Sequence, residues 1–190
     1  MTMTTASLLS KATSNNNDDR MTSLADTWSI KAKDLTEEAF RPFGQVCRAQ
    51  VDGKLFDHDD AQLQLEEGGT PRFYIMRLSR RNGLAAVDRI TRHVRCTQCL
   101  GSLQGKEWFM AVAPANKEPC RDNIEAFRIP GDCFIKLETG TWHAGPFFEK
   151  DETIDFYNLE MKDTNVVDHD TRDLKETCGA TFQIIDRPEG

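Results

Sequence analysis

Short runs of alternating apolar and polar residues recur along the chain, and Gly or Pro stands between most of them. Alternation with a period of two puts successive side chains on opposite faces of a strand, so each run predicts a half-buried β-strand. Many short strands divided by turn residues favour an all-β barrel or sandwich. The predicted strands are residues 28–32, 45–51, 73–78, 87–93, 97–103, 107–113, 127–129, 133–137 and 154–161.

Helical signals are few. Thr36 is typical of a helix N-cap and precedes a single short turn, residues 37–40, which Pro42 and Gly44 would end. We therefore expect one short helix near the N-terminal end of the ordered chain, and no segment has the pattern of a long amphipathic helix.

Four further features complete the outline. A Pro130-Gly131 turn is expected between two strands, and residues 52–69 are polar and acidic, which predicts a loop. Residues 172–189 predict a tail of mixed structure, and residues 1–26, rich in Ser, Thr and Asn, predict a disordered leader. Residues 27–190 are then expected to form one domain.

The segment with the most candidate functional residues is ITRHVRCTQCLGSLQG, residues 90–105. Thr91 and His93 are two apart, so on a strand they face the same way, and Gln98 belongs to the next strand beyond a bend. Its spacing is that of the first motif of a cupin, a double-sheet jelly roll whose inward side chains make one site. Cupins usually have histidine where Thr91 stands and glutamate where Gln98 stands.

The second segment is GTWHAGPFF, residues 140–148, in which Gly140 stands three positions ahead of His143. We expect His93 and His143 to converge inside one cupin-type, double-stranded β-helix barrel. We expect the cavity to remain despite the replacements at Thr91 and Gln98. Strong metal binding is not expected, because the replacements remove an imidazole and a carboxylate from the set of donors.

Charge and cysteine content narrow the class of protein. The chain of 190 residues has a net charge of −7 and a pI near 5.1, which disfavours nucleic acid and anionic membrane surfaces as partners. No apolar run is long enough to cross a bilayer. Six cysteines at irregular spacing indicate free thiols in a reducing compartment, which favours the cytoplasm. An organelle transit peptide is the alternative interpretation of the Ser-rich leader.

Taken together, five stretches resemble the ureidoglycolate lyase family, formerly called ureidoglycolate hydrolases, and most closely its plant-type branch. They are LTEEAFRPFGQV, PRFYIMRL, ITRHVRCTQCLGS, TGTWHAGPFF and DFYNLEMKDTNVVDH, and they extend in order over about residues 28–174. The resemblance implies a cupin-fold homodimer. It also implies a carbon–nitrogen lyase that splits ureidoglycolate into glyoxylate and urea in allantoin (purine) degradation.

Two positions depart from the bacterial members of the family. Those members carry Trp-His-His-Pro where this chain has Trp142-His143-Ala144-Gly145, and they tend to lack a lysine at the position of Lys136. Two alternatives follow: a cupin enzyme acting on another small hydroxy- or keto-acid, or a non-catalytic cupin that binds a small carboxylate. Fold alone does not decide between them.

Cleavage of ureidoglycolate requires a cation for the carboxylate, a base for the hydroxyl proton and an acid for the departing nitrogen. His93 and His143 suit the proton transfers because the pKa of imidazole lies near working pH. Arg72 suits the carboxylate, since a guanidinium grips it through two parallel hydrogen bonds. Lys136 would serve as an acid or base if it points inward, where burial would lower its pKa.

Other residues are candidates for holding substrate or metal. Gln98, Trp142 and Tyr157 are candidates for substrate binding, with a structural role as the alternative for each; Tyr157 shares a strand face with Asp155. His93, Gln98 and His143 could together ligate a divalent ion such as nickel, manganese or zinc.

Three further patterns look like chemical sites without the context they need. The C-x-x-C of Cys96 and Cys99 has no second pair for zinc. The clusters Asp57-His58-Asp59-Asp60 and Asp168-His169-Asp170 are each predicted to be solvated turns.

Overall fold

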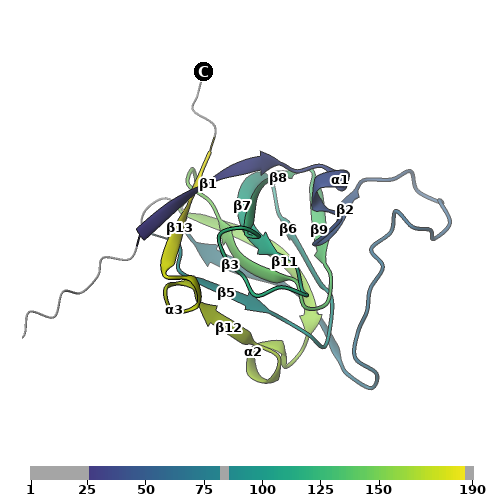
Figure 1. Ribbon diagram of the computed structural model, residues 1–190. Coiled ribbons are helices and arrows are strands. Elements are labelled where there is room, and N and C mark those ends of the chain that lie inside the picture. Colours follow the sequence, from purple (N-terminus) through teal and green to yellow (C-terminus); the bar gives the residue numbers. More distant parts are fainter. Residues whose placement is uncertain (1–25, 82–85, 187–190) are drawn as a thin grey trace, which may run out of the picture.

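The computed structural model describes residues 26–81 and 86–186 (Figure 1). The predicted leader, residues 1–26, lies outside the described residues except for Asp26, where the first strand begins. The elements are β1 (Asp26–Asp34), α1 (Glu37–Phe40), β2 (Gly44–Arg48), β3 (Pro71–Ser79), β4 (Ala86–Val87), β5 (Arg89–Arg92), β6 (Gln98–Ser102), β7 (Gly105–Ala113), β8 (Glu125–Gly131), β9 (Cys133–Leu137), β10 (Trp142–Phe147), β11 (Thr153–Met161), α2 (Thr164–Val167), β12 (Asp170–Asp173), α3 (Leu174–Cys178) and β13 (Ala180–Ile185).

The described strands form two sheets. The larger sheet has eight strands in the order β12-β5-β10-β7-β8-β1-β13-β4, and the smaller has five in the order β2-β9-β6-β11-β3. Only β1 pairs in parallel, with β8 and with β13, and the remaining pairs among the described strands are antiparallel. The predicted all-β, double-sheet jelly roll is confirmed, and so is the short N-terminal helix α1, whereas the short helices α2 and α3 were not predicted.

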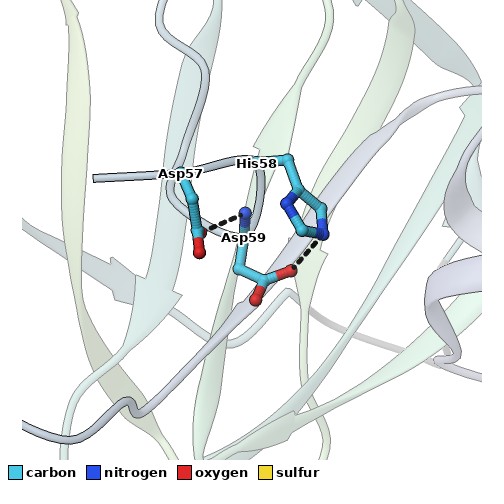
Figure 2. A group of neighbouring side chains, drawn as sticks. All are labelled: Asp57, His58 and Asp59. Carbon is cyan, nitrogen blue, oxygen red and sulfur yellow. Dashed lines mark hydrogen bonds and ion pairs between the residues drawn. The ribbon is translucent and has the colours of Figure 1, made fainter. Parts of the chain in front are cut away.

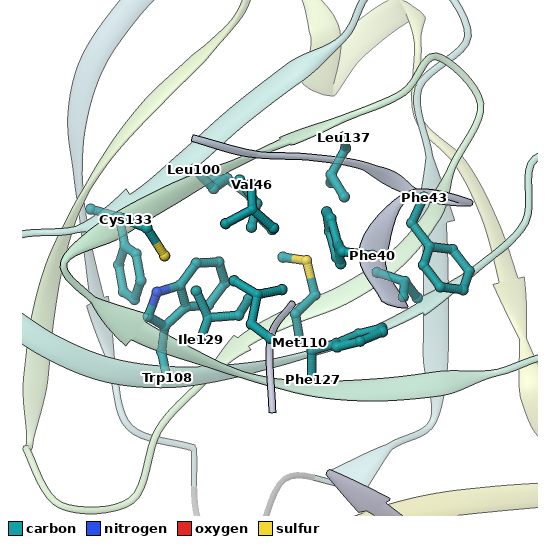
Figure 3. Packing of buried hydrophobic residues seen from close by; sticks show 14 of the residues in the cluster. Phe40, Phe43, Val46, Leu100, Trp108, Met110, Phe127, Ile129, Cys133 and Leu137 are labelled. Atoms are coloured by element: carbon teal, nitrogen blue, oxygen red, sulfur yellow. The ribbon is translucent and has the colours of Figure 1, made fainter. Parts of the chain in front are cut away.

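Apolar side chains fill one end of the space between the sheets (Figure 3). Phe40 and Phe43 pack against Phe127 with ring centroids 5.3 and 5.8 Å apart, and Trp108 meets Phe156 edge to face at 5.3 Å. Each such buried aromatic side chain removes enough apolar area from water to contribute about 2–3 kcal/mol. This packing fixes the separation of the two sheets and so determines how much space is left at the other end.

The short helix α1 begins as predicted. The side chain of Thr36 accepts a hydrogen bond from the backbone N–H of Ala39 at 3.1 Å, which satisfies one of the free donors of the first turn. The turn places Phe40 in the core with no exposed surface. Gly44 follows where β2 meets β9, and a Cβ there would lie 1.9 Å from the carbonyl oxygen of Lys136, so only glycine permits this approach.

The structure differs from the predicted local structure in three places. The strand β10 was expected only as a motif, and Pro130-Gly131, expected to be a turn, ends the strand β8. The predicted mixed tail holds two ordered strands, β12 and β13. Both strands pair with partners far away in the sequence, β5 and β1, so local alternation carried little sign of them.

The segment between β2 and β3 has no helix or named strand, as predicted, and is joined to the rest by a bridge between Leu65 and Cys96. It extends away from the two sheets on the right of Figure 1. Val51, Leu55 and Phe56 on this segment are largely exposed.

Candidate active site

The end of the inter-sheet space that the apolar core does not fill is a cavity of about 740 Å³. The strands β5, β10 and β12 of the larger sheet form one wall, and β3, β6 and β11 of the smaller sheet form the other. Its lining residues are Tyr74, Met76, Leu78, Arg81, Asp88, Arg89, Thr91, His93, Gln98, Leu100, His143, Ala144, Gly145, Pro146, Asn158, Glu160, Asn165, His169 and Thr171. The two segments singled out in the sequence therefore meet in one place.

His93 and His143 lie side by side on the wall formed by the larger sheet, with ring centroids 5.1 Å apart. The register of the larger sheet brings them together, because His143 on β10 pairs directly with Thr91 on β5. Nδ1 of His93 is hydrogen-bonded to the carbonyl oxygen of Asp168, and Nδ1 of His143 to that of Thr141 at 3.1 Å. A carbonyl can only accept, so both rings carry the proton on Nδ1 and keep the lone pair of Nε2.

Both of these imidazoles are held in the neutral form. Desolvation, and to a smaller extent the neighbouring His93, lower the pKa of His143 to about 3. Burial also lowers the pKa of His93, and there the hydrogen bond to Asp168 and the charges of Asp168 and Glu160 act in the opposite direction. The protonated form is therefore less unfavourable at His93 than at His143.

A third imidazole, His169, lies on the exposed side of the cavity. Its ring centroid is 5.9 Å from that of His93, and its Nδ1 is 3.1 Å from the hydroxyl of Thr171. The hydroxyls of Thr171 and Thr91 are in turn 2.8 Å apart, so a hydrogen-bonded chain joins β12 to β5. Thr91, at the position where cupins usually carry a histidine, thus contacts a histidine by way of a second threonine.

Asp168 is buried and holds the bend that carries His93. Its carboxylate accepts from the backbone N–H groups of Val94 and Arg95, both at 2.8 Å. The prediction of a solvated turn at Asp168-His169-Asp170 is therefore wrong: Asp168 is inside and His169 lines the cavity. The reason is the long-range pairing of β12 with β5, which the local sequence does not encode.

A polar network forms the opposite, buried wall. Nε2 of Gln98 donates to Oδ1 of Asn158 at 3.1 Å and to Oε2 of Glu160 at 3.2 Å. The hydroxyl of Tyr74 accepts from Nδ2 of Asn158 at 3.1 Å and donates to Oε1 of Glu160 at 3.3 Å. Oε1 of Gln98 has no hydrogen-bond partner among the described residues. The network fixes the orientation of every one of these side chains.

Of the other candidates from the sequence, Arg72 is engaged with this network from outside the cavity lining. Its guanidinium lies 3.6 Å from the centroid of the Tyr74 ring and 3.8 Å from Oε1 of Glu160. Glu160 already offsets its charge, so Arg72 is not a free anchor for a carboxylate.

Lys136, Tyr157 and Trp142 lie on sheet faces that point away from the cavity. Lys136 is buried and forms an ion pair with Glu138. Tyr157 packs between the rings of Phe73 and Phe134 on the outer face of the smaller sheet.

Trp142 alternates with His143 on β10 and is fully buried on the other side of that strand. Its Nε1 donates to the carbonyl of Lys117 at 3.1 Å, and the guanidinium of Arg92 lies 4.4 Å from its ring centroid.

Sequence reasoning missed the partners that β11 supplies. Asp155 and Tyr157 were singled out on this strand, but Asp155 points outward and pairs with Arg77 at 2.7 Å. The inward positions are Asn158 and Glu160, one register step away. Asn158 and Glu160 continue, at steps of two, the face that begins with the apolar residues Ile154 and Phe156, and this pattern was the available signal.

The loop cluster behaves as predicted (Figure 2). Asp57, His58 and Asp59 form the one group of three His, Cys, Asp or Glu ligands, among the described residues, whose donor atoms lie within 4.8 Å of one another. Lys54 pairs with both aspartates at 2.9 and 2.8 Å, so the acidic charge is already offset. The side chain of His58 is 89% exposed, which is typical of a solvated turn.

The donors in the cavity fit a divalent ion by their chemistry. His93 and His143 present neutral imidazoles with free Nε2 lone pairs, and Gln98 adds an amide oxygen without a partner. Imidazole nitrogen with oxygen donors suits borderline ions such as nickel or zinc. The ligand atoms of His93, His143 and His169 do not all lie within 4.8 Å of one another, as those of the loop cluster do.

The fold and the cavity together define a class: an all-β, double-sheet protein whose site is built from paired imidazoles and a buried amide–carboxylate network. The sequence matches the profile of the Ureidoglycolate lyase family over residues 27–181. The chain belongs to this family.

Individual relatives carry the same name. A ureidoglycolate lyase of Pseudomonas putida (strain W619) is 28% identical over 132 residues, which are 60% of this chain and 74% of that protein. One of Burkholderia mallei (strain NCTC 10229) is 28% identical over 137 residues, 67% and 79% of the two chains. One of Pseudomonas fluorescens (strain SBW25) is 27% identical over 153 residues, 72% and 86% of the two chains.

Among solved structures, a chain of an oxalate decarboxylase aligns with a TM-score of 0.38 and 12% identity, over 57% of this chain and 25% of that one. So slight a likeness says nothing further about this protein. None of the helices in the described part of the chain is both long and apolar enough to cross a membrane.

Proposed function

We propose that this protein is a ureidoglycolate lyase, which cleaves ureidoglycolate to glyoxylate and urea in the degradation of allantoin. The observation that carries the proposal is the pair of neutral, tautomer-fixed imidazoles of His93 and His143 in a cavity large enough for a small acid. The ureidoglycolate lyases among the relatives supply the substrate class.

The reaction is an elimination in which His93 moves the proton. Nε2 of His93 takes the proton of the substrate hydroxyl, the O–H electrons form the carbonyl of glyoxylate, and the carbon–nitrogen bond breaks. The same proton then passes from His93 to the departing nitrogen, which leaves as urea. His93 is the better base of the two because the charges of Glu160 and Asp168 favour its protonated form.

His143 remains neutral throughout this sequence. Desolvation keeps its pKa far below neutrality, so it acts as a hydrogen-bonding and positioning group beside the reacting carbon. Gln98 orients the substrate from the opposite wall. A divalent ion held by His93, His143 and Gln98 would supply Lewis-acid polarisation of the substrate oxygens. Nε2 of His93 would then be a ligand and could not also take the hydroxyl proton, so the ion is an alternative to His93 acting as the base.

Lys136, Trp142 and Tyr157 receive no place in this mechanism, because the faces on which they lie point away from the cavity. Membership of the plant-type branch, expected from Ala144-Gly145 and Lys136, stays a prediction. So does a cytoplasmic location.

The direct test is to mix purified full-length protein with ureidoglycolate and to follow glyoxylate release. The assay is run after treatment with EDTA and again with added nickel or manganese, which separates a metal requirement from the elimination itself. Release above the spontaneous rate supports the proposal. No release above that rate under any of the three conditions rejects it.

We also propose a homodimer, and the outer face of the smaller sheet is the surface that supports it. The rings of Phe73, Tyr157 and Phe134 follow one another with centroids 6.3 and 6.0 Å apart. Phe73 and Ile75 are 69% and 64% exposed on β3, which is an edge strand of its sheet. A contiguous apolar stripe beside an unpaired edge is typical of a self-association surface.

Light scattering after size-exclusion chromatography tests the dimer. The wild-type protein should elute at twice the monomer mass, and Ile75→Lys should elute as a monomer. Phe56→Lys, which changes a residue that is 75% exposed on the loop, is the matched control and should leave the dimer intact. A monomeric wild type contradicts the proposal.

A further inference from the structure

We infer that Arg89 holds the carboxylate of the substrate, and that the ureido N–H groups point the other way, toward Glu160 and its network. The inference rests on the proposed function, because only that function gives the substrate a ureido group. The charged side chains that line the cavity support it; Asp88 lies in the lining next to Arg89, without an ion pair between the two.

The described residues that line the cavity include two guanidinium groups, those of Arg81 and Arg89. No described carboxylate forms an ion pair with Arg89, whereas the candidate from the sequence, Arg72, lies beside Glu160. An arginine whose charge is not already offset can give its full charge-assisted hydrogen bonds to a bound carboxylate.

Strand register places Arg89 within reach of the reacting groups. Arg89, Thr91 and His93 share one face of the β5 segment, and Thr91 pairs with His143. Arg89 is thus two residues, roughly 7 Å along the strand, from the point where the two histidine segments meet. The extended side chain of an arginine covers a separation of this size.

Arg81 is less well placed. Its guanidinium lies 5.1 Å from the ring centroid of Phe147, which is four residues beyond His143 on β10. Four residues of a fully extended strand span roughly 13 Å, and the irregularity between Ala144 and Phe147 shortens this distance, but Arg81 still lies further along the sheet from the imidazoles than Arg89 does.

The opposite end of the site repels a carboxylate and attracts N–H donors. Glu160 is 2% exposed, and its oxygens face Tyr74 and Gln98 across the buried wall. Oxygen acceptors also come from Asn158 and Gln98. An anionic end placed there would meet a buried carboxylate, so the anionic end belongs at Arg89 and the nitrogen end at Glu160.

Binding measurements with two stable analogues test the inference without any need for turnover. N-carbamoylglycine carries the carboxylate and the ureido group but lacks the hydroxyl, and its neutral amide, ureidoacetamide, has nearly the same shape without the charge. Titration calorimetry with the full-length protein gives the ratio of the two affinities. Wild-type protein should prefer the acid by about tenfold or more, as a charge-assisted contact implies.

Variants then locate the charge that causes this preference. Arg89→Met should bring the acid-to-amide ratio close to one, and Arg89→Lys should restore part of it. Arg48→Met, which removes an exposed charge that does not line the cavity, is the matched control for net charge and should leave the ratio unchanged. Arg72→Met should also keep the preference.

Two outcomes overturn the inference: no preference for the acid in the wild type, or a preference that survives in Arg89→Met. If Arg72→Met is the variant that loses the ratio, the sequence-based assignment of Arg72 is restored. The glyoxylate assay is independent of these measurements. An enzyme that releases glyoxylate but keeps its acid preference in Arg89→Met retains the proposed function and loses only this orientation.

Discussion

Histidine stands beside aspartate both in the cavity and in the loop between β2 and β3, and the two places differ in what surrounds the imidazole. In the loop, His58 is 89% exposed and lies 3.2 Å from Asp59. In the cavity, His93 is 5% exposed and its Nδ1 meets a backbone carbonyl of Asp168. The loop has the tighter cluster of ligand atoms, yet water competes for each of them.

The difference shows that proximity of reactive residue types is a weak indication of chemistry. Burial lowers the pKa of His93 and His143 and leaves each Nε2 unprotonated, while the carbonyl partners fix which nitrogen carries the proton. In the loop, Lys54 offsets the acidic charge, and salt bridges at exposed positions contribute little to stability. Matched substitutions in the cavity and in the loop should therefore have different effects.

The largest expected effect is on catalysis. His93→Asn removes the base that takes the hydroxyl proton, so kcat for glyoxylate release should fall roughly 10²- to 10⁴-fold. His143→Asn should lower kcat by a similar factor through loss of positioning. His58→Asn in the loop should stay within about twofold of wild type. Full activity in His93→Asn would contradict the assignment of His93 as the base.

A smaller effect is expected at the two aspartates. Asp168→Asn weakens the hydrogen bonds to the N–H groups of Val94 and Arg95, so the free energy of unfolding should fall by about 1–3 kcal/mol. Asp57→Asn removes only exposed contacts and should cost less than about 0.5 kcal/mol. Urea unfolding of both variants measures the difference, and equal losses would contradict the contrast between the two places.

The pH dependence of stability should differ in the same way. The pKa of His143 is about 3 in the folded protein against 6.5 for a free side chain. Between these values the unfolded chain binds a proton that the folded protein does not, so stability falls as the pH falls below 6.5. From pH 7 to 5 the wild type should lose on the order of 1–2 kcal/mol more than His143→Asn.

Urea unfolding of both proteins at the two pH values, in the presence of EDTA, checks this. His58→Asn is the control and should follow the wild type, because its imidazole is solvated in both states. A His143→Asn protein with the same pH dependence as the wild type would show that His143 is not buried in neutral form.

The smallest expected effect concerns the loop cluster as a ligand site. Nickel or zinc should raise the melting temperature of Asp57→Asn and of the wild type equally, because exposed and already paired carboxylates hold ions weakly. Loss of the shift in Asp57→Asn, but not in His93→Asn, would place the ion in the loop and reverse the comparison.

Much of the fold could be read from the sequence because its signals are local. Alternation predicted β3, β9 and β11 within about two residues, and Thr36 marked the start of α1. The spacing of His93, Gln98 and His143 predicted the two segments that meet in the cavity. All three of these residues line it.

The sequence could not say which face of a strand points inward. A period of two gives two equivalent faces, and a shift of one residue exchanges them. On β11 the outward pair Asp155 and Tyr157 was chosen over the inward pair Asn158 and Glu160. Trp142 beside His143 was misassigned to the cavity for the same reason.

The sequence by itself determined that this is a double-sheet β protein with two histidine segments brought to one site, because strand periodicity and motif spacing are properties of neighbouring residues. Only the tertiary structure decided which guanidinium is free, that His169 joins the other imidazoles, and that Lys136 is turned away. The first two facts depend on the pairing of β12 with β5 and of β11 with β3, which join residues about 80 positions apart. The third depends on the pairing of β9 with β2 and β6. Register over such separations is chosen by the packing of the whole sheet, and no local stretch of sequence contains it.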